Sequence, residues 1–326
     1  MQKLLNLKSK LSFMELTSEV RKLIKDGKPL EALELIKKNA PDDVRKVVER
    51  VFEKPEDIKN LSGIWKTLVL LSYFSYSSMY FAGRNDNQSL VSCVISSINA
   101  VKLSNELGFE DLIPMFLRNA ARALTMMDMK DRAERMYLEA EKICEKIADF
   151  KEYAYVENDL ATLYFELKRY VEARIKIETA IEIWRELEDY ENLAESLTNA
   201  AEIYIKLGEF DNAEKCFKEA ESIYRKLINE KESLKLNFAV MLSNFGIFYK
   251  NRNRHKEAER LLLESLKIFE ELERIDDEFS QFVATTLKYL GDLNREMKRF
   301  DKANEYYRKS REKFKEIQMK WESIAG

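Results

Sequence analysis

Small and large side chains recur along this chain at the spacing of one helical face, and the same arrangement returns several times. A small residue appears at intervals of 40, 40, 40, 45 and 45, at Cys93, Ala133, Ala173, Ala213, Ala258 and Ala303. From Ala133 onward, a large side chain follows each of these positions after four residues and a small one after seven. Spacings of four and seven share one face of an α-helix. The pattern therefore predicts amphipathic helices arranged in an internal repeat.

A second helix is predicted upstream of each of these positions. Twelve residues before the last five of them lies another small residue, at Ala121, Ala161, Ala201, Gly246 and Gly291. Segments such as LKRY at 167–170, LGEF at 207–210 and MKRF at 297–300 separate the two helices. Each repeat is thus expected to be a hairpin whose small residues let two antiparallel helices approach closely. One hairpin cannot bury its apolar face alone, so the hairpins are expected to stack.

Composition agrees with an all-α protein. The 326 residues include only 8 Gly and 4 Pro, too few for the many turns of a sandwich, a barrel or a Rossmann-type sheet. Lys, Glu, Leu and Ala, which favour helices, dominate instead.

The repeat resembles the tetratricopeptide repeat. One copy reads Ala161, Tyr164, Ala173, Ile177 and Ala180, with a small residue and an aromatic in the first helix and small, large and small residues in the second. The resemblance covers residues 85–326 and implies a right-handed superhelical solenoid of antiparallel helix hairpins. The period exceeds the usual length of about 34, which we attribute to helices longer by about a turn. This longer form is similar to the repeats of the kinesin light chain and of spindle-orientation adaptors.

Residues 1–84 match the repeat less well. Breaks at 27–29, Pro41 and Pro55 divide them into short amphipathic helices. We expect an N-terminal helical cap or degenerate repeat, since terminal repeats are commonly atypical. The repeat array is expected over 85–326.

The aromatic-rich helix expected at 64–82 has an uncharged stretch from Thr67 to Ala82. This stretch is too short and too rich in serine to span a membrane. We interpret it as core, and a surface that faces a partner is the alternative.

Charge and cysteine content limit the expected partners and the expected cellular compartment. The formal net charge is −3, whereas a dedicated duplex-binding domain usually has a clear basic excess. Three widely spaced cysteines favour neither a disulfide framework nor a metal site, so a reducing cytoplasm is expected. Abundant charge of mixed sign with few glutamines is typical of a thermophilic source. Neither a nucleic acid nor a membrane is an expected partner.

The sequence carries no motif of a known catalytic class. The single histidine, His255, excludes a site built from several histidines of one chain, and its position in the repeat elsewhere holds an aromatic residue. We therefore expect no enzyme, no metal and no cofactor.

An asparagine column is the clearest candidate for binding. Two residues before the small residue of the first four of these first helices lie Asn119, Asp159, Asn199 and Asn244, with Asn158 next to the second. An amide offers donors and an acceptor, so it can bind a peptide backbone whatever the side chains. The resemblance to long-repeat adaptors implies that Asn119, Asn199 and Asn244 clamp a peptide on the concave surface. The alternative is that these amides bridge neighbouring helices within the stack.

Charged residues flank this column. Arg118 and Lys288 lie one residue before it, and Arg122 and Glu202 lie one turn after the asparagine. Arg118, Asn119 and Arg122 match the carboxylate clamp of chaperone-binding repeats only in part. These flanking residues are expected to set which peptides bind.

We expect this chain to be a non-enzymatic adaptor that holds an extended segment of a protein or peptide partner in the concave groove of its superhelix. One alternative is a peptide-sensing regulator that acts on a second target through its N-terminal helices. Another is a homo-oligomeric scaffold that associates through the helix at 64–82 or through an end of the array.

Overall fold

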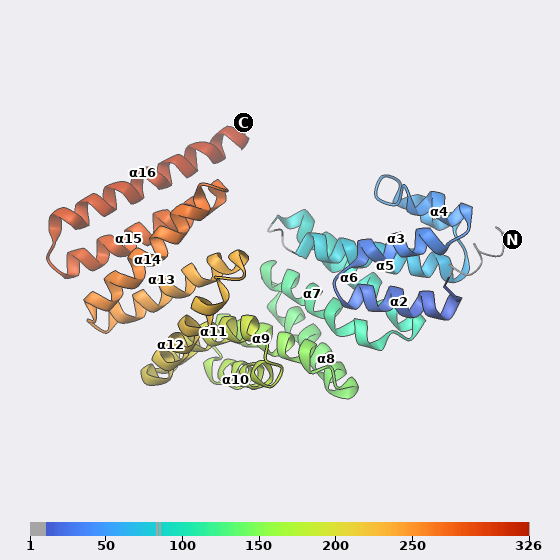
Figure 1. The fold of residues 1–326 in the computed structure, drawn as a ribbon, viewed down its shortest axis with the longest axis horizontal. Coiled ribbons are helices and arrows are strands. Elements are labelled where there is room, and N and C mark those ends of the chain that lie inside the picture. Colours follow the sequence, from blue (N-terminus) through green and yellow to red (C-terminus); the bar gives the residue numbers. More distant parts are fainter. Residues whose placement is uncertain (1–10, 83, 85, 326) are drawn as a thin grey trace. The chain divides into compact units, whose positions relative to one another are not determined.

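The computed structural model describes residues 11–82, 84 and 86–325, and it describes side chains up to residue 320. Every regular element in these ranges is a helix. The chain divides into two compact units, one up to Ile183 and one from Trp184 onward. The all-α fold of stacked antiparallel hairpins is confirmed (Figure 1). The cap expected at 1–84 is not a unit of its own by this division, and its boundary stays a prediction.

The N-terminal unit begins with three short helices and continues with hairpins. Its α-helices are α2 (Phe13–Lys25), α3 (Pro29–Asn39), α4 (Asp42–Val48), α5 (Gly63–Ala82), α6 (Asn87–Leu107), α7 (Ile113–Met126), α8 (Lys130–Ile147), α9 (Phe150–Glu166) and α10 (Tyr170–Glu186), whose end lies past the boundary. Short 3₁₀ turns lie at Pro55–Asn60 and Glu110–Leu112. Within this unit α5 packs on α6, α6 on α7, and α7 on α8.

The C-terminal unit consists of three hairpins. Its helices are α11 (Tyr190–Leu207), α12 (Phe210–Leu227), α13 (Lys235–Asn251), α14 (His255–Glu273), α15 (Ser280–Glu296) and α16 (Phe300–Ala325). Each odd-numbered helix packs along the even-numbered helix that follows it.

The small residues of the repeat lie where two helices meet. Ala133, Ala213 and Ala258 are fully or almost fully buried. A Cβ added to Gly246 would come within 2.8 Å of Leu262, and one added to Gly291 within 2.7 Å of the Tyr307 ring. Both partners are the large residues of the repeat, so small first-helix positions provide the space that these side chains fill.

Left-handed turn residues mark a half-repeat of one helix and one turn. Positive φ angles recur every twenty residues, at Gly108, Asp128, Ala148, Lys168, Glu188 and Gly208. Such a residue ends a helix because its backbone reverses the chain while satisfying the last carbonyls. Only two of these six positions are glycine, so most turns adopt a conformation that disfavours their side chains.

The longer 45-residue repeats contain an added turn. The 3₁₀ segments Glu232–Leu234 and Asp277–Phe279 lie between consecutive hairpins of the C-terminal unit. Helix lengths differ little between the two kinds of repeat: α12 has 18 residues and α13 has 17. The step from 40 to 45 therefore comes from these connections, and the longer helices that we expected to explain a period of 40–45 against about 34 do not account for this part of it.

Arginines that follow the left-handed residue join neighbouring hairpins. Arg169 reaches back to Glu134, Arg254 to Glu214 and Arg299 to Glu259, each with an Nη1 to Oε1 distance of 2.8 Å. The guanidiniums of Arg169 and Arg254 also lie 4.1 and 4.0 Å from the ring centres of Tyr164 and Tyr249. Arginine suits this role because its planar group can stack and pair at once.

One face of the aromatic helix α5 is core, as predicted, whereas Met79 and Tyr80 near its end are exposed. Leu68, Val69 and Leu71 are fully buried, and they share one apolar cluster with Leu16 of α2 and Phe116 of α7. The N-terminal helices thus share a continuous core with the hairpins that follow them. In the part of the chain that the structure describes, no helix combines the length and hydropathy that a membrane span requires.

The turn geometry predicts that glycine is the favoured residue at two equivalent positions, so removing it from one should destabilise the chain and adding it at the other should stabilise it. Gly208→Ala should lower the free energy of unfolding by about 1 kcal/mol, because a Cβ is disfavoured at a φ of 78°. A Cβ there would meet no neighbouring atom within 4 Å, so the cost is conformational. Lys168→Gly should raise stability by about 0.5 kcal/mol. Calorimetric unfolding of both variants measures this, with Lys168→Ala as the control. A Lys168→Gly protein less stable than Lys168→Ala would contradict it.

Candidate functional site

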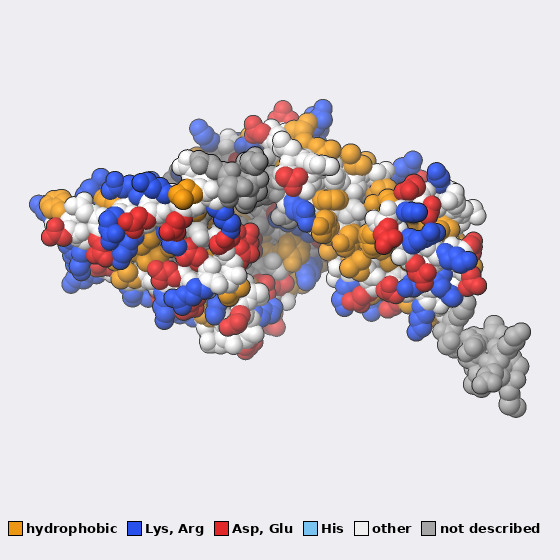
Figure 2. Space-filling view, turned by 90° about the horizontal axis from the view of Figure 1, so that it is seen from above, with side chains coloured by type: hydrophobic (Ala, Val, Ile, Leu, Met, Phe, Trp, Pro, Cys, Tyr) orange, Lys and Arg blue, Asp and Glu red, His pale blue; other side chains and the backbone are white. Residues whose placement is uncertain are grey.

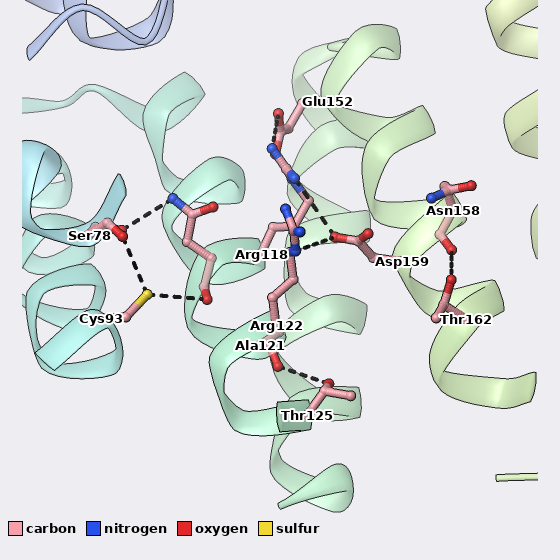
Figure 3. A network of polar contacts seen from close by, with 11 residues as sticks. Ser78, Cys93, Arg118, Ala121, Arg122, Thr125, Glu152, Asn158, Asp159 and Thr162 are labelled. Carbon is pink, nitrogen blue, oxygen red and sulfur yellow. Dashed lines mark hydrogen bonds and ion pairs between the residues drawn. The ribbon is translucent and has the colours of Figure 1, made fainter. Parts of the chain in front are cut away.

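A cluster of charged residues joins the first helices α7 and α9 of the N-terminal unit (Figure 3). Arg118 on α7 lies between two acids of α9. Its Nε is 2.6 Å from Glu152 Oε1, and its Nη1 is 3.7 Å from Asp159 Oδ2. The guanidinium also lies 4.8 Å from the ring centre of Tyr155. The side chain of Arg118 is only 13% exposed, so this arginine holds two helices together from within.

Burial and charge act against each other in this cluster. Burial raises the pKa of both Glu152 and Asp159, while the nearby Arg118 lowers it in part. Burial also lowers the pKa of Arg118, but the two carboxylates outweigh it and the net shift is upward. A buried cation with two acids is stable only while all three remain together.

Asn119, the first residue of the asparagine column, is buried within the stack. Its Nδ2 donates to Ser78 Oγ on α5 at 3.2 Å. Cys93 Sγ on α6 donates to the backbone oxygens of Ser78 and Asn119, at 3.4 and 3.6 Å. These contacts join α5, α6 and α7 (Figure 3). They correspond to the helix-bridging alternative, and a ligand contact by Asn119 stays a prediction.

Other polar groups of this cluster reach the surface. The side chain of Arg122 is 52% exposed and approaches Asp159 Oδ2 at 4.0 Å. Asn158 is half-buried on α9, and its backbone oxygen accepts a hydrogen bond from exposed Thr162 at 3.1 Å. Arg122, Asn158 and Thr162 therefore present donors and acceptors of two neighbouring first helices to solvent.

The C-terminal unit carries the rest of the column. Asn199 on α11 and Asn244 on α13 are both half-buried. The Nδ2 of Asn244 donates to Glu202 Oε1, which links the two helices. Burial raises the pKa of Glu202, and Lys206 opposes this shift. Lys288 is exposed on α15.

The predicted residues thus form two groups, one in each unit. Arg118, Asn119, Arg122 and Asn158 lie on α7 and α9, while Asn199, Glu202, Asn244 and Lys288 lie on α11, α13 and α15. The sequence did not identify the partners of Arg118, because pairing across neighbouring hairpins depends on side-chain direction as well as on repeat position. One signal was present: Glu152 and Asp159 lie seven residues apart on one helical face.

A second buried cluster lies where α8, α9 and α10 meet. The side chain of Glu157 is 2% exposed, and its Oε1 lies 3.0 Å from Lys176 Nζ. Lys176 also pairs with Glu141, so one cation serves two acids. Burial raises the pKa of Glu157, Lys176 lowers it, and Glu141 raises it further. The net result is a pKa of about 7.

Among the described residues, no three His, Cys, Asp or Glu side chains are placed to hold a metal ion. His255 begins α14, and its Nε2 lies 3.8 Å from Oε2 of Glu296 at the end of α15. Burial raises the pKa of the Cys93 and Cys144 thiols, which disfavours the reactive thiolate.

Arg118 and Arg122 are predicted to differ sharply in their effect on stability. Arg118→Leu leaves Glu152 and Asp159 buried without their cation, and it should lower the free energy of unfolding by about 3–5 kcal/mol. Arg122→Ala removes a half-exposed side chain and should cost less than about 1 kcal/mol. Urea unfolding followed by circular dichroism measures both, and equal losses in the two variants would contradict the assignment.

The Glu157 cluster predicts a pH dependence of stability. The pKa of Glu157 is about 7 in the folded chain against 4.5 as the ordinary value. The folded state therefore binds this proton more tightly, and stability is lost as pH rises through about 7. Glu157→Gln should remove this loss, so its advantage over the native chain should grow from about pH 5 to about pH 8. Urea unfolding across this range tests it, with Glu139→Gln on the exposed face of α8 as the control. An advantage that does not change with pH would contradict the prediction.

Comparison with known proteins gives a family and a fold. Residues 152–226 and 237–316 match the family model described as tetratricopeptide repeat. No curated protein sequence matches this chain.

Several solved structures are similar over most of the chain. The BtubC (BKLC) structure from P. vanneervenii has a TM-score of 0.61 at 20% identity, and it covers 70% of this chain and 92% of its own. The apo quorum sensor NprR from B. thuringiensis has a TM-score of 0.60 at 16% identity, and it covers 96% and 91%. A Rap protein complexed with Competence and Sporulation Factor has a TM-score of 0.58 at 13% identity, and it covers 93% and 98%. At these identities the likeness concerns the fold.

Proposed function

This chain belongs to the tetratricopeptide repeat family, and on that premise we propose that it is a non-enzymatic binding protein that holds an extended peptide segment of a protein partner on its first helices. The observation that carries the proposal is the polar column at one position of successive first helices. Asn158, Asn199 and Asn244 are half-buried at or beside this position on α9, α11 and α13. A half-buried amide has donors and an acceptor, so it can bind a peptide backbone in addition to its contacts within the chain.

The surroundings of the column indicate which peptides would suit it. In the N-terminal unit Arg122 lies beside the column and favours an acidic side chain of the ligand. In the C-terminal unit Glu202 lies there and favours a basic one, while Lys288 on α15 again favours an acid. Within the C-terminal unit, an extended peptide that carries one basic and one acidic residue would satisfy Glu202 and Lys288.

A peptide-sensing regulator is the second candidate. The similar structures include a Rap protein complexed with Competence and Sporulation Factor and the apo quorum sensor NprR. The likeness to NprR covers 96% of this chain, so it extends over the N-terminal helices. In this reading the same column binds a peptide, and α2 to α4 act on a second protein in the cytoplasm.

Peptides selected from a random displayed library provide the test. Changing Asn199 and Asn244 together to Ala should lower the affinity for the selected peptide by at least about tenfold, since each lost amide hydrogen bond contributes about 1 kcal/mol. Fluorescence polarisation measures the affinity, and circular dichroism checks that the variant stays helical.

The matched control is Asn212→Ala, which removes an exposed amide on the second helix α12. Unchanged affinity in the double variant would contradict the proposal that the column is the binding surface. Loss of binding in both variants would point to a ligand on the opposite face. A change in compactness on peptide binding, measured by small-angle scattering, would favour the regulator over a static adaptor.

A further inference from the structure

Residues at the column position approach a fixed position of the preceding first helix. In the C-terminal unit, Nδ2 of Asn244 on α13 donates to Oε1 of Glu202 on α11. In the N-terminal unit, Oδ2 of Asp159 on α9 lies 4.0 Å from Nε of Arg122 on α7. Glu202 and Arg122 are equivalent, because each follows the column position of its own helix by three residues. In each unit, the residue one turn past the column thus lies beside the column residue of the next first helix.

Glu202 determines which end of the Asn244 amide faces outward. An ionised carboxylate only accepts hydrogen bonds, so it holds the NH2 group of the amide and leaves the oxygen. Among the described residues, no group donates to Oδ1 of Asn244, and this oxygen is not buried. Asn244 therefore offers an accessible acceptor, while its NH2 group is turned toward Glu202.

Asn244 is flanked by apolar side chains on its own helix. Val240 and Ile247 lie one turn before and one turn after it on α13, and both are half-buried. Beside aliphatic side chains a hydrogen bond is stronger than in water, and a polar group without a partner costs more. A peptide group that meets Asn244 must therefore match its oxygen.

The carboxylate of Glu202 is partly shielded from solvent. Burial raises the pKa of Glu202, and Lys206, one turn further along α11, opposes this rise and favours the charged form. A hydrogen bond to a shielded carboxylate competes less with water than one on the open surface. The bond from Asn244 is therefore suited to hold the amide in place before a peptide arrives.

A fixed orientation changes what an asparagine can recognise. A free amide exchanges its oxygen and its NH2 group by a half-turn, so it can meet either a peptide N–H or a peptide carbonyl. Holding the amide in one orientation removes this choice. It also removes the cost of ordering the side chain when the peptide binds.

Charge alone does not distinguish this part of the chain. Figure 2 shows Lys, Arg, Asp and Glu side chains interspersed over the surface of the C-terminal unit, at left. Attraction between exposed charges is screened by salt and depends little on direction. A hydrogen bond of fixed direction therefore adds a selection that such a surface lacks.

We propose that Glu202 is a positioning residue, which holds Asn244 with its oxygen toward the bound peptide, so that this point of the column accepts a backbone N–H. This role rests on the proposed function and deepens it by fixing the direction of one hydrogen bond. It also restricts the ligand, because proline has no N–H and is excluded from the residue that meets Asn244.

The peptide selected from the displayed library tests this role on the full chain at about pH 7.5, where glutamate is ionised. Each of its residues is replaced in turn by the matching α-hydroxy acid, so that one backbone N–H becomes an ester oxygen. At one position the ester should lower the affinity by about fivefold, and proline there should be at least as harmful. In Asn244→Ala this ester should have no effect, which identifies the N–H that Asn244 accepts. Fluorescence polarisation measures each affinity.

The ratio of the amide to the ester affinity separates positioning from a structural role. In Glu202→Ala the freed amide can turn its NH2 group to the ester oxygen, so the ratio should fall from about fivefold to less than twofold. A merely structural contribution of Glu202 would weaken both peptides equally and leave the ratio unchanged. The matched control is Glu230→Ala, which removes an exposed acid after α12 and should keep the native ratio.

A second substitution should rescue the ratio. Aspartate has no NH2 group, so it offers an oxygen in either orientation. Adding Asn244→Asp to Glu202→Ala should therefore return the ratio to fivefold or more. Circular dichroism checks that each variant stays helical.

A measurement without peptide tests the orientation itself. In the chain labelled with ¹⁵N-asparagine, the NH2 protons of Asn244 should exchange with water more slowly than those of exposed Asn304, because Glu202 holds them. Glu202→Ala should remove the difference. Equal exchange rates for Asn244 and Asn304 in the native chain would overturn the positioning role.

The remaining outcomes separate this role from the proposed function. If Asn244→Ala weakens binding but the ratio stays about fivefold in Glu202→Ala, the column binds the peptide and Glu202 does not position it. If Asn244→Ala weakens binding and no ester has an effect, Asn244 does not accept a backbone N–H, and the inference is wrong. If Asn199 and Asn244 can both be changed to Ala without loss of affinity, the proposed function is wrong as well.

Discussion

The close approach of paired helices at positions with small side chains is the constraint on which both units depend. The repeat places a large residue opposite each small one, so Leu262 fills the space over Gly246 and Tyr307 the space over Gly291. Between hairpins, Arg169, Arg254 and Arg299, each after a turn, reach an acid of the preceding hairpin. The same spacing brings α9 near enough to α7 for Arg118 to pair with Glu152 and Asp159. Packing, ion pairs and the polar column therefore share one geometric origin.

Much of the fold was predictable because helix contacts require small residues, and these small residues recur at a fixed spacing in the sequence. Ala133 and its equivalents must be small to be buried at a helix contact, and their spacing predicted the hairpins from Ile113 onward. The 3₁₀ connections were not predicted, since five added residues can lengthen a helix or a loop and the repeat pattern is the same in both cases. The burial of one face of α5 was predicted from its composition, because the uncharged stretch from Thr67 to Ala82 is rich in apolar residues.

The candidate site was predictable in position but less so in chemistry. The repeat register placed Asn119, Asn199 and Asn244 at equivalent points of their helices, yet they have different environments. Asn119 meets Ser78 on α5, a helix in which the repeat pattern is weak, and it is buried there. Asn244 instead meets Glu202 of a regular repeat and remains half-buried. Both amides thus bond within the chain, and the depth at which each is buried depends on its neighbour.

The left-handed turns every twenty residues have a consequence for how such a chain can change in length. Gly108, Ala148 and Glu188 have the same backbone conformation at the same point between successive hairpins. A segment that begins after one of these residues and ends at the next is a complete hairpin with matching ends. Duplicating or deleting it joins backbone of one conformation to backbone of the same conformation, so neither junction requires a new turn. The chain can thus gain or lose first-helix surface in whole hairpins, and a gene can sample arrays of different lengths by recombination between its own repeats.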